Sequence, residues 1–144
     1  MLACAVLGMM LGLSAPAMPR GLDASTMVVG INAEREAERR GPLRVDATLT
    51  AVALEHALDM ARHDYFGHLG PSGLSPFARL RNARLRFAYA GEDLEFDRDE
   101  PSAEHALWNS EPHRRNALEP YFNHVGAAAV CTARGEFFVE EFSG

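Results

Sequence analysis

Residues 51–83 read AVALEHALDMARHDYFGHLGPSGLSPFARLRNA. The apolar residues in the first half of this stretch recur at steps of three and four, which is the spacing of one face of a helix. Asp46 stands where a helix cap is expected, so we predict a helix from Asp46 to about His63. The turn residues of 64–74 predict a loop, and Ser75, which is followed by proline, predicts the start of a second, short helix.

The flanking segments predict further helices and, at the end of the chain, a pair of strands. Helical spacing predicts a helix over about 25–40 and another over 101–108. The acidic stretch 92–100 is interpreted as a solvated loop. Residues 125–133 and 136–142 flank a tight turn and predict a β-hairpin. Helices followed by an antiparallel pair predict the α+β class, with helices packed on an antiparallel sheet.

The composition is that of one folded domain. The chain has 144 residues, of which 47% are apolar and 24% charged, enough for a core and too apolar for disorder. The net charge of -6 provides no basic field for nucleic acid, so we expect no such partner. Arg79, Arg81, Arg84 and Arg86 are interpreted as a solvated face. Nucleophile-elbow, Walker, dinucleotide and C-x-x-C motifs are absent from the sequence, which leaves phosphoryl transfer and dinucleotide redox chemistry without support.

The first residues have the character of a secretory leader. The run MLACAVLGMMLGL is apolar and is followed by SAPAM, which contains an A-x-A-type cleavage site at 15–17. We therefore predict a signal peptide or its remnant over 1–20, a single domain over 23–144, and an extracellular or periplasmic location. The run is too short to span a bilayer, so we expect no transmembrane segment in the mature chain. No Lys or Arg precedes the run, and a buried apolar helix is the alternative interpretation.

Three polar residues stand at irregular positions where a scaffold can expose them. His68 and His113 lie beside turn residues, and Glu92 follows Ala-Gly at a break in the pattern. Two imidazoles and a carboxylate can bind a divalent metal, or they can serve as general acid and base. No short motif joins the three, so the residues alone leave both options open. His56, on the apolar face of its predicted helix, is expected to be a hydrogen-bonded core histidine.

Four segments, taken in order, resemble one known family. Residues 51–83 resemble its helix, Y-F-x-H turn and short helix, and AGEDL at 90–94 resembles its G-E-N-[IL] segment. NSEPHRRNAL at 109–118 resembles N-S-P-G-H-R-x-N-I-L, and 125–142 resembles a terminal hairpin that ends in Q-x-F. The family is the CAP superfamily of SCP-like domains, which includes cysteine-rich secretory, antigen 5 and pathogenesis-related proteins. With two cysteines, this chain resembles the bacterial, cysteine-poor type.

The resemblance implies a fold and a site. The fold is a three-layer α-β-α sandwich with a central antiparallel sheet. The site is a cleft in which His68, Glu92 and His113 converge, with His68 and His113 as ligands of zinc or another divalent metal. Glu92 is then the catalytic candidate. Glu111 is a further cleft candidate, although one alignment places it at a family glutamate and another at a family proline.

Two departures from the family motifs change the chemistry of the chain. Asp93 replaces the asparagine that follows the family glutamate, and Glu140 replaces the glutamine of Q-x-F. A carboxylate next to Glu92 is expected to raise one pKa of the pair or to favour a bound cation.

Three functions remain open from the sequence. The first is an exported module that binds a small molecule, a lipid or a protein partner, with or without a divalent metal. The second is a secreted metal-dependent hydrolase or protease, in which Glu92 activates a metal-bound water. The third is a structural domain whose polar network only fixes its loops.

Overall fold

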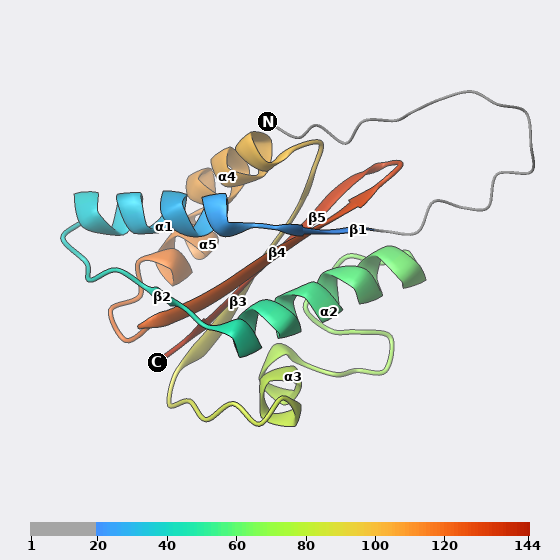
Figure 1. The fold of residues 1–144 in the computed structure, drawn as a ribbon, viewed down its shortest axis with the longest axis horizontal. Coiled ribbons are helices and arrows are strands. Elements are labelled where there is room, and N and C mark those ends of the chain that lie inside the picture. The colour runs from blue at the N-terminus through green and yellow to red at the C-terminus, as the bar shows by residue number, and fades with distance from the viewer. Residues whose placement is uncertain (1–19) are drawn as a thin grey trace, which may run out of the picture.

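The computed structural model describes residues 20–144, so nearly all of the predicted leader lies outside the described residues (Figure 1). The helices are α1 Ser25–Ala37, α2 Ala47–His63, α3 Pro76–Asn82, α4 Glu100–Asn109 and α5 Glu111–Ala117. The strands are β1 Arg20–Asp23, β2 Arg44–Val45, β3 Ala90–Asp97, β4 His124–Thr132 and β5 Gly135–Ser143.

The strands form one sheet between two layers of helices. Its order is β1-β4-β5-β3, with every neighbouring pair antiparallel, and the short β2 pairs in parallel with β4 beyond the end of β1. Helices α1, α4 and α5 cover one face of the sheet, and α2 and α3 cover the other (Figure 1). The predicted α+β class and the three-layer α-β-α sandwich are confirmed, and the parallel β2 is the one departure from an antiparallel sheet.

Helix α2 lies against the sheet because its sequence and that of β4 fit each other. Asp46 caps the helix, its side chain accepting from the backbone N–H groups of Thr48 and Leu49 at 2.7 and 3.0 Å. Gly126 of β4 lies directly under the first turn, where an added Cβ would come 2.1 Å from the backbone nitrogen of Thr50. Only glycine permits this close approach, which fixes the height of α2 above the strands.

A buried arginine ties the opposite helical layer together. Arg35 of α1 donates to the carbonyl oxygens of Gly41 and Ala117, both at 2.7 Å, and to those of Glu119 and Phe122. These carbonyls belong to the segment that follows α1, to the last residue of α5 and to the segment that follows α5. The single guanidinium therefore satisfies backbone groups that would otherwise be left without partners near the core.

The interpretation of residues 92–100 as a solvated loop is wrong. Strand β3 runs through Asp97 and pairs with β5 over its whole length. Glu92, Asp93 and Leu94 are all buried. The acidic composition misled the interpretation because these carboxyl groups face packed helices instead of water.

Candidate functional site

Glu92 is the centre of a buried ionic cluster on the face of the sheet that α2 and α3 cover. Its side chain is 1% exposed. His68 Nδ1 lies 2.7 Å from one carboxylate oxygen, and Arg79 donates from Nη2 to the other at 2.5 Å. His56 Nε2 stands farther off, 3.8 Å from the second oxygen. Both oxygens of Glu92 are therefore occupied by cationic or potentially cationic partners.

Arg79 connects this cluster to the loop over 64–74. Besides Glu92, its guanidinium donates to the backbone carbonyls of His68 and Leu74, both at 3.0 Å. Its side chain is only 10% exposed, so the interpretation of Arg79 as part of a solvated face is wrong.

His56 also anchors the loop over 64–74. It is buried, and its Nε2 lies 3.1 Å from the carbonyl oxygen of Gly67, which can only accept, so Nε2 carries the proton. Burial lowers the pKa of His56 in spite of the nearby Glu92 charge, which keeps the ring neutral. The prediction of a hydrogen-bonded core histidine is confirmed.

A second acid completes the cluster. Glu141 of β5 is the cross-strand partner of Glu92 and is fully buried. Burial and the Glu92 charge raise the pKa of Glu141 to about 10, so this carboxyl group is neutral beside Glu92, and neither of its oxygens has a hydrogen-bond partner of normal geometry among the described residues. Burial alone would disfavour the Glu92 carboxylate, but the hydrogen bond from His68, the neutral Glu141 beside it and the Arg79 charge outweigh it and lower its pKa. The hydrogen bond to Glu92 correspondingly raises the pKa of His68.

The residues expected to form a metal site are not arranged as one. Among residues that the structure describes, no three His, Cys, Asp or Glu side chains converge on a point where an ion could sit. The Arg79 guanidinium already neutralises Glu92 and would repel a cation there. Glu111 is exposed at the start of α5 and pairs with Arg115 at 3.5 Å, remote from this chemistry. A divalent ion does not fit this arrangement of His68 and Glu92.

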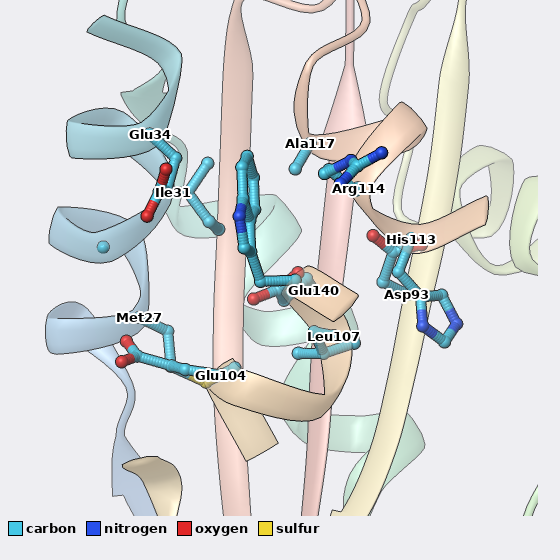
Figure 2. Close-up of a pocket in the computed structure, with 12 residues that line it drawn as sticks. Met27, Ile31, Glu34, Asp93, Glu104, Leu107, His113, Arg114, Ala117 and Glu140 are labelled. Carbon is cyan, nitrogen blue, oxygen red and sulfur yellow. The ribbon is translucent and has the colours of Figure 1, made fainter. Parts of the chain in front are cut away.

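A cavity lies on the opposite face of the sheet, between α1, α4, α5 and the strands (Figure 2). We name it the α1–α4 cavity; its volume is about 100 Å³, room for several water molecules or a small ligand. It is lined by Met27, Gly30, Ile31, Glu34, Asp93, Glu104, Leu107, Trp108, His113, Arg114, Ala117 and Glu140. Figure 2 shows these side chains coming from both walls, with Met27 and Ile31 on α1 and Glu140 on the floor between them and β3.

Two carboxyl groups form the floor of the α1–α4 cavity. Asp93 of β3 and Glu140 of β5 are cross-strand partners, and they are 1% and 3% exposed. Asn116 donates to one oxygen of Asp93 at 2.8 Å, which leaves the other oxygen buried and without a partner among the described residues. Burial raises the pKa of Asp93 to about 7 and, together with the charge of Asp93, raises that of Glu140 well above its usual value.

His113 lines this cavity and is not bonded to Glu92 in the described part of the chain. It stands on α5 where that helix meets β3, near Asp93 (Figure 2). Its Nδ1 is buried without a hydrogen-bond partner in the described part of the chain. Burial lowers the pKa of His113 against the opposing charge of Glu95, and His68 lowers it further, so the ring is neutral. The structure thus joins His68 to Glu92 by a hydrogen bond, while His113 lines the α1–α4 cavity and is near enough to His68 for the charge of His68 to act on it.

Comparison with known proteins identifies the family. Residues 30–142 match the Cysteine-rich secretory protein family, CAP, and the chain belongs to this family. It is 34% identical over 114 residues to the uncharacterised protein YkwD of Bacillus subtilis, covering 78% of this chain and 44% of YkwD. The chain thus spans less than half the length of that relative.

Solved structures show the same fold. An extracellular SCP-domain protein of Bacillus anthracis matches with a TM-score of 0.73 and 26% identity, over 83% of this chain and 39% of that one. An outer surface protein of Borrelia burgdorferi matches with a TM-score of 0.80 and 21% identity, over 88% and 98% of the two chains. Within residues 20–144, none of the helices combines the length and apolarity that crossing a bilayer requires.

Proposed function

We propose that this CAP domain is the ligand-binding module of an exported protein and that the α1–α4 cavity is its binding site. The observation that carries the proposal is the cavity itself: a concave space with apolar walls and a small number of buried polar groups, two of which lack partners. Preformed pockets of this composition are the usual sites of small ligands.

In this proposal the Glu92 cluster is a positioning element. It fixes the loop over 64–74 through Arg79 and His68, whose contacts leave no free oxygen on Glu92. A metal-dependent hydrolase would require Glu92 to accept a proton from a metal-bound water, and a carboxylate already bonded to Arg79 is a poor base because its pKa is lowered. Metal analysis of the purified protein and of a His68→Ala/His113→Ala variant tests the metal prediction directly.

A pair of leucine substitutions on α1 tests the cavity. An added Cβ at Gly30 would lie 2.9 Å from Oε1 of Glu104, so Gly30→Leu places a side chain into the cavity. Ala33→Leu, on the exposed side of the same helix, is the matched control. Native mass spectrometry after incubation with a small-molecule cell extract should show a retained ligand on the wild type and on Ala33→Leu, and none on Gly30→Leu. Equal retention by all three proteins would place the binding site elsewhere.

Export is a separate part of the proposal. It rests on the apolar leader with its A-x-A-type site and on the likeness to an extracellular SCP-domain protein. Fractionation of the source cells, followed by N-terminal sequencing of the exported protein, should show cleavage near residue 17. A protein found inside the cell with Met1 intact would contradict export but leave the cavity proposal standing.

A further inference from the structure

The two departures from the family motifs meet in the α1–α4 cavity. Asp93 stands where the motif has asparagine, and Glu140 stands where it has glutamine. The strand register makes these two residues direct partners on the face that α1 and α4 cover. Two neutral amides of the family pattern have therefore become two carboxyl groups at the same point of this cavity.

In the described part of the chain, neither carboxyl group forms an ion pair with a basic side chain, and only the charge of His68 acts on Asp93 from the neighbouring cluster. One oxygen of Asp93 is buried without a donor, and the buried Glu140 has the acidic Asp93 and Glu104 as its neighbouring charges. On the other face of the same strands, Glu92 has Arg79 and His68. A buried carboxylate that lacks such partners is costly, so in the free protein the raised pKa values favour the protonated groups, and a bound cation would favour their ionised forms.

Other residues that line the cavity add further acidic side chains and an apolar surface. Glu104 of α4 and Glu34 of α1 also line the cavity, against one arginine, the exposed Arg114. The neutral His113 adds no positive charge. The indole of Trp108 packs against the core cluster on this face and lines the same space, and an indole face attracts cations.

We propose that the α1–α4 cavity binds a small organic cation, an ammonium group on a short apolar body, with Asp93 and Glu140 as its counter-charges. The inference deepens the proposed function, because it requires the cavity to be the ligand site. The chemistry favours an organic cation over a metal ion, since no three carboxylates or imidazoles of the described residues converge on one point. An ammonium needs only nearby acceptors, while its carbon chain contacts Met27, Ile31 and Leu107.

The pKa shifts of the carboxyl groups that line the cavity are consistent with a cationic ligand. Burial raises the pKa of Asp93, of Glu104 and of Glu140, in each case with a contribution from another carboxylate. A bound ammonium would favour the ionised forms and release protons. Binding should therefore strengthen as the pH rises from 6 to 8, the range in which Asp93, with a pKa of about 7, loses its proton.

The test uses the only tryptophan of the chain as a reporter, since Trp108 lines the cavity. The full chain is titrated at pH 8 with n-butylammonium, n-butanol, butyrate and Zn²⁺, and the Trp108 fluorescence is followed. We expect saturable binding of n-butylammonium at least about tenfold tighter than that of butanol or butyrate. The double variant Asp93→Asn/Glu140→Gln, which restores the family amides, should lose this preference, and Glu36→Gln, on the exposed side of α1, should keep it.

Each other result overturns the inference in an identifiable way. If butanol or butyrate binds as tightly as n-butylammonium and Gly30→Leu abolishes that binding, the cavity is a ligand site but not one for cations. If Zn²⁺ displaces n-butylammonium at equal concentration, the carboxyl groups form a metal site instead. If no probe binds and Gly30→Leu matches the wild type throughout, the proposed function fails as well. Should the double variant not fold, Glu104→Gln on the cavity wall, expected to weaken n-butylammonium binding about threefold, replaces it.

Discussion

Two adjacent residues of β3 carry carboxyl groups to opposite faces of the sheet, and their surroundings differ in one respect. Glu92 and its partner Glu141 face α2 and α3, where Arg79 and His68 compensate the single negative charge. Asp93 and its partner Glu140 face a cavity whose one lining cation, the exposed Arg114, forms no ion pair with either of them among the described residues. The strand supplies the same kind of residue twice, so the helical layer above each face decides whether a carboxyl group is structural or available to a ligand.

Removal of Arg79 should have the largest effect, because it leaves the buried Glu92 without a guanidinium partner, as Asp93 is on the opposite face of the sheet. Arg79→Met leaves Glu92 buried with half-exposed His68 as its remaining close partner, and we expect the free energy of unfolding at pH 7 to fall by about 3–5 kcal/mol. The loss should shrink as the pH is lowered, since Glu92 without Arg79 takes up a proton more readily. Urea unfolding at pH 5 and pH 7 measures both quantities.

The control for Arg79→Met is Arg81→Met on the same helix. Arg81 is exposed, and its guanidinium lies 5.6 Å above the ring of Phe87, an interaction worth about 0.5–1 kcal/mol at the surface. Similar losses for the two variants would mean that the ionic cluster contributes little and that the two faces do not differ as the structure indicates.

Amide substitutions at positions 92 and 93 should act in opposite directions. The pKa of Glu92 is lowered, so its ionised form stabilises the fold at neutral pH and this contribution is lost only in acid. Glu92→Gln should therefore cost about 2–3 kcal/mol at pH 7, from lost charge-assisted hydrogen bonds. The pKa of Asp93 is raised to about 7, so ionisation of Asp93 destabilises the fold as the pH rises from about 4 to 7.

Asp93→Asn should consequently leave stability unchanged or increase it at pH 7. It should also remove up to about 1.4 kcal/mol per pH unit from the pH dependence between pH 5 and 7, because the variant has no proton to lose at this position. Urea unfolding of both variants across this range makes the comparison. Parallel pH profiles for Glu92→Gln and Asp93→Asn would show that the two carboxyl groups have equivalent environments.

The sequence predicts the helices and the terminal hairpin around these carboxyl groups, but not the partners that each carboxyl group has. The apolar spacing of α2, its Asp46 cap and the terminal hairpin are local patterns, and the family motifs then place His68 and Glu92 in one region. Local patterns do not show which strand pairs with β3, and without that register Glu141 and Glu140 cannot be assigned to Glu92 and Asp93. Arg79 was misassigned for the same reason: its partner is contributed by a strand that starts 11 residues later, at Ala90.

Substitutions of Glu141 should have a smaller effect on stability, and they test whether its carboxyl group is protonated. Because the pKa of Glu141 is raised to about 10, its carboxyl group is neutral beside Glu92, and the equally neutral amide of Glu141→Gln can replace it. We expect less than about 1 kcal/mol of destabilisation for Glu141→Gln and about 1–3 kcal/mol for Glu141→Leu, which removes the neutral polar group next to the Glu92 charge. Thermal unfolding at pH 7 separates them, and a larger loss for the glutamine would indicate an ionised Glu141.

The smallest effect is expected at the exposed end of the cluster. The side chain of His68 is 54% exposed, so water screens its bond to Glu92, and His68→Ala should cost no more than about 0.5–1 kcal/mol. The pKa of His68 is raised by that bond, so its contribution is complete below pH 6.5 and is lost as the pH rises through the raised value. Hydrogen exchange in the loop over 64–74 should therefore quicken in the wild type between pH 6 and 8, beyond the intrinsic rise, and should lose this extra dependence in His68→Ala. The variant His105→Ala, at an exposed position on α4, should keep it, and an unchanged profile in His68→Ala would assign the anchoring of the loop to Arg79 alone.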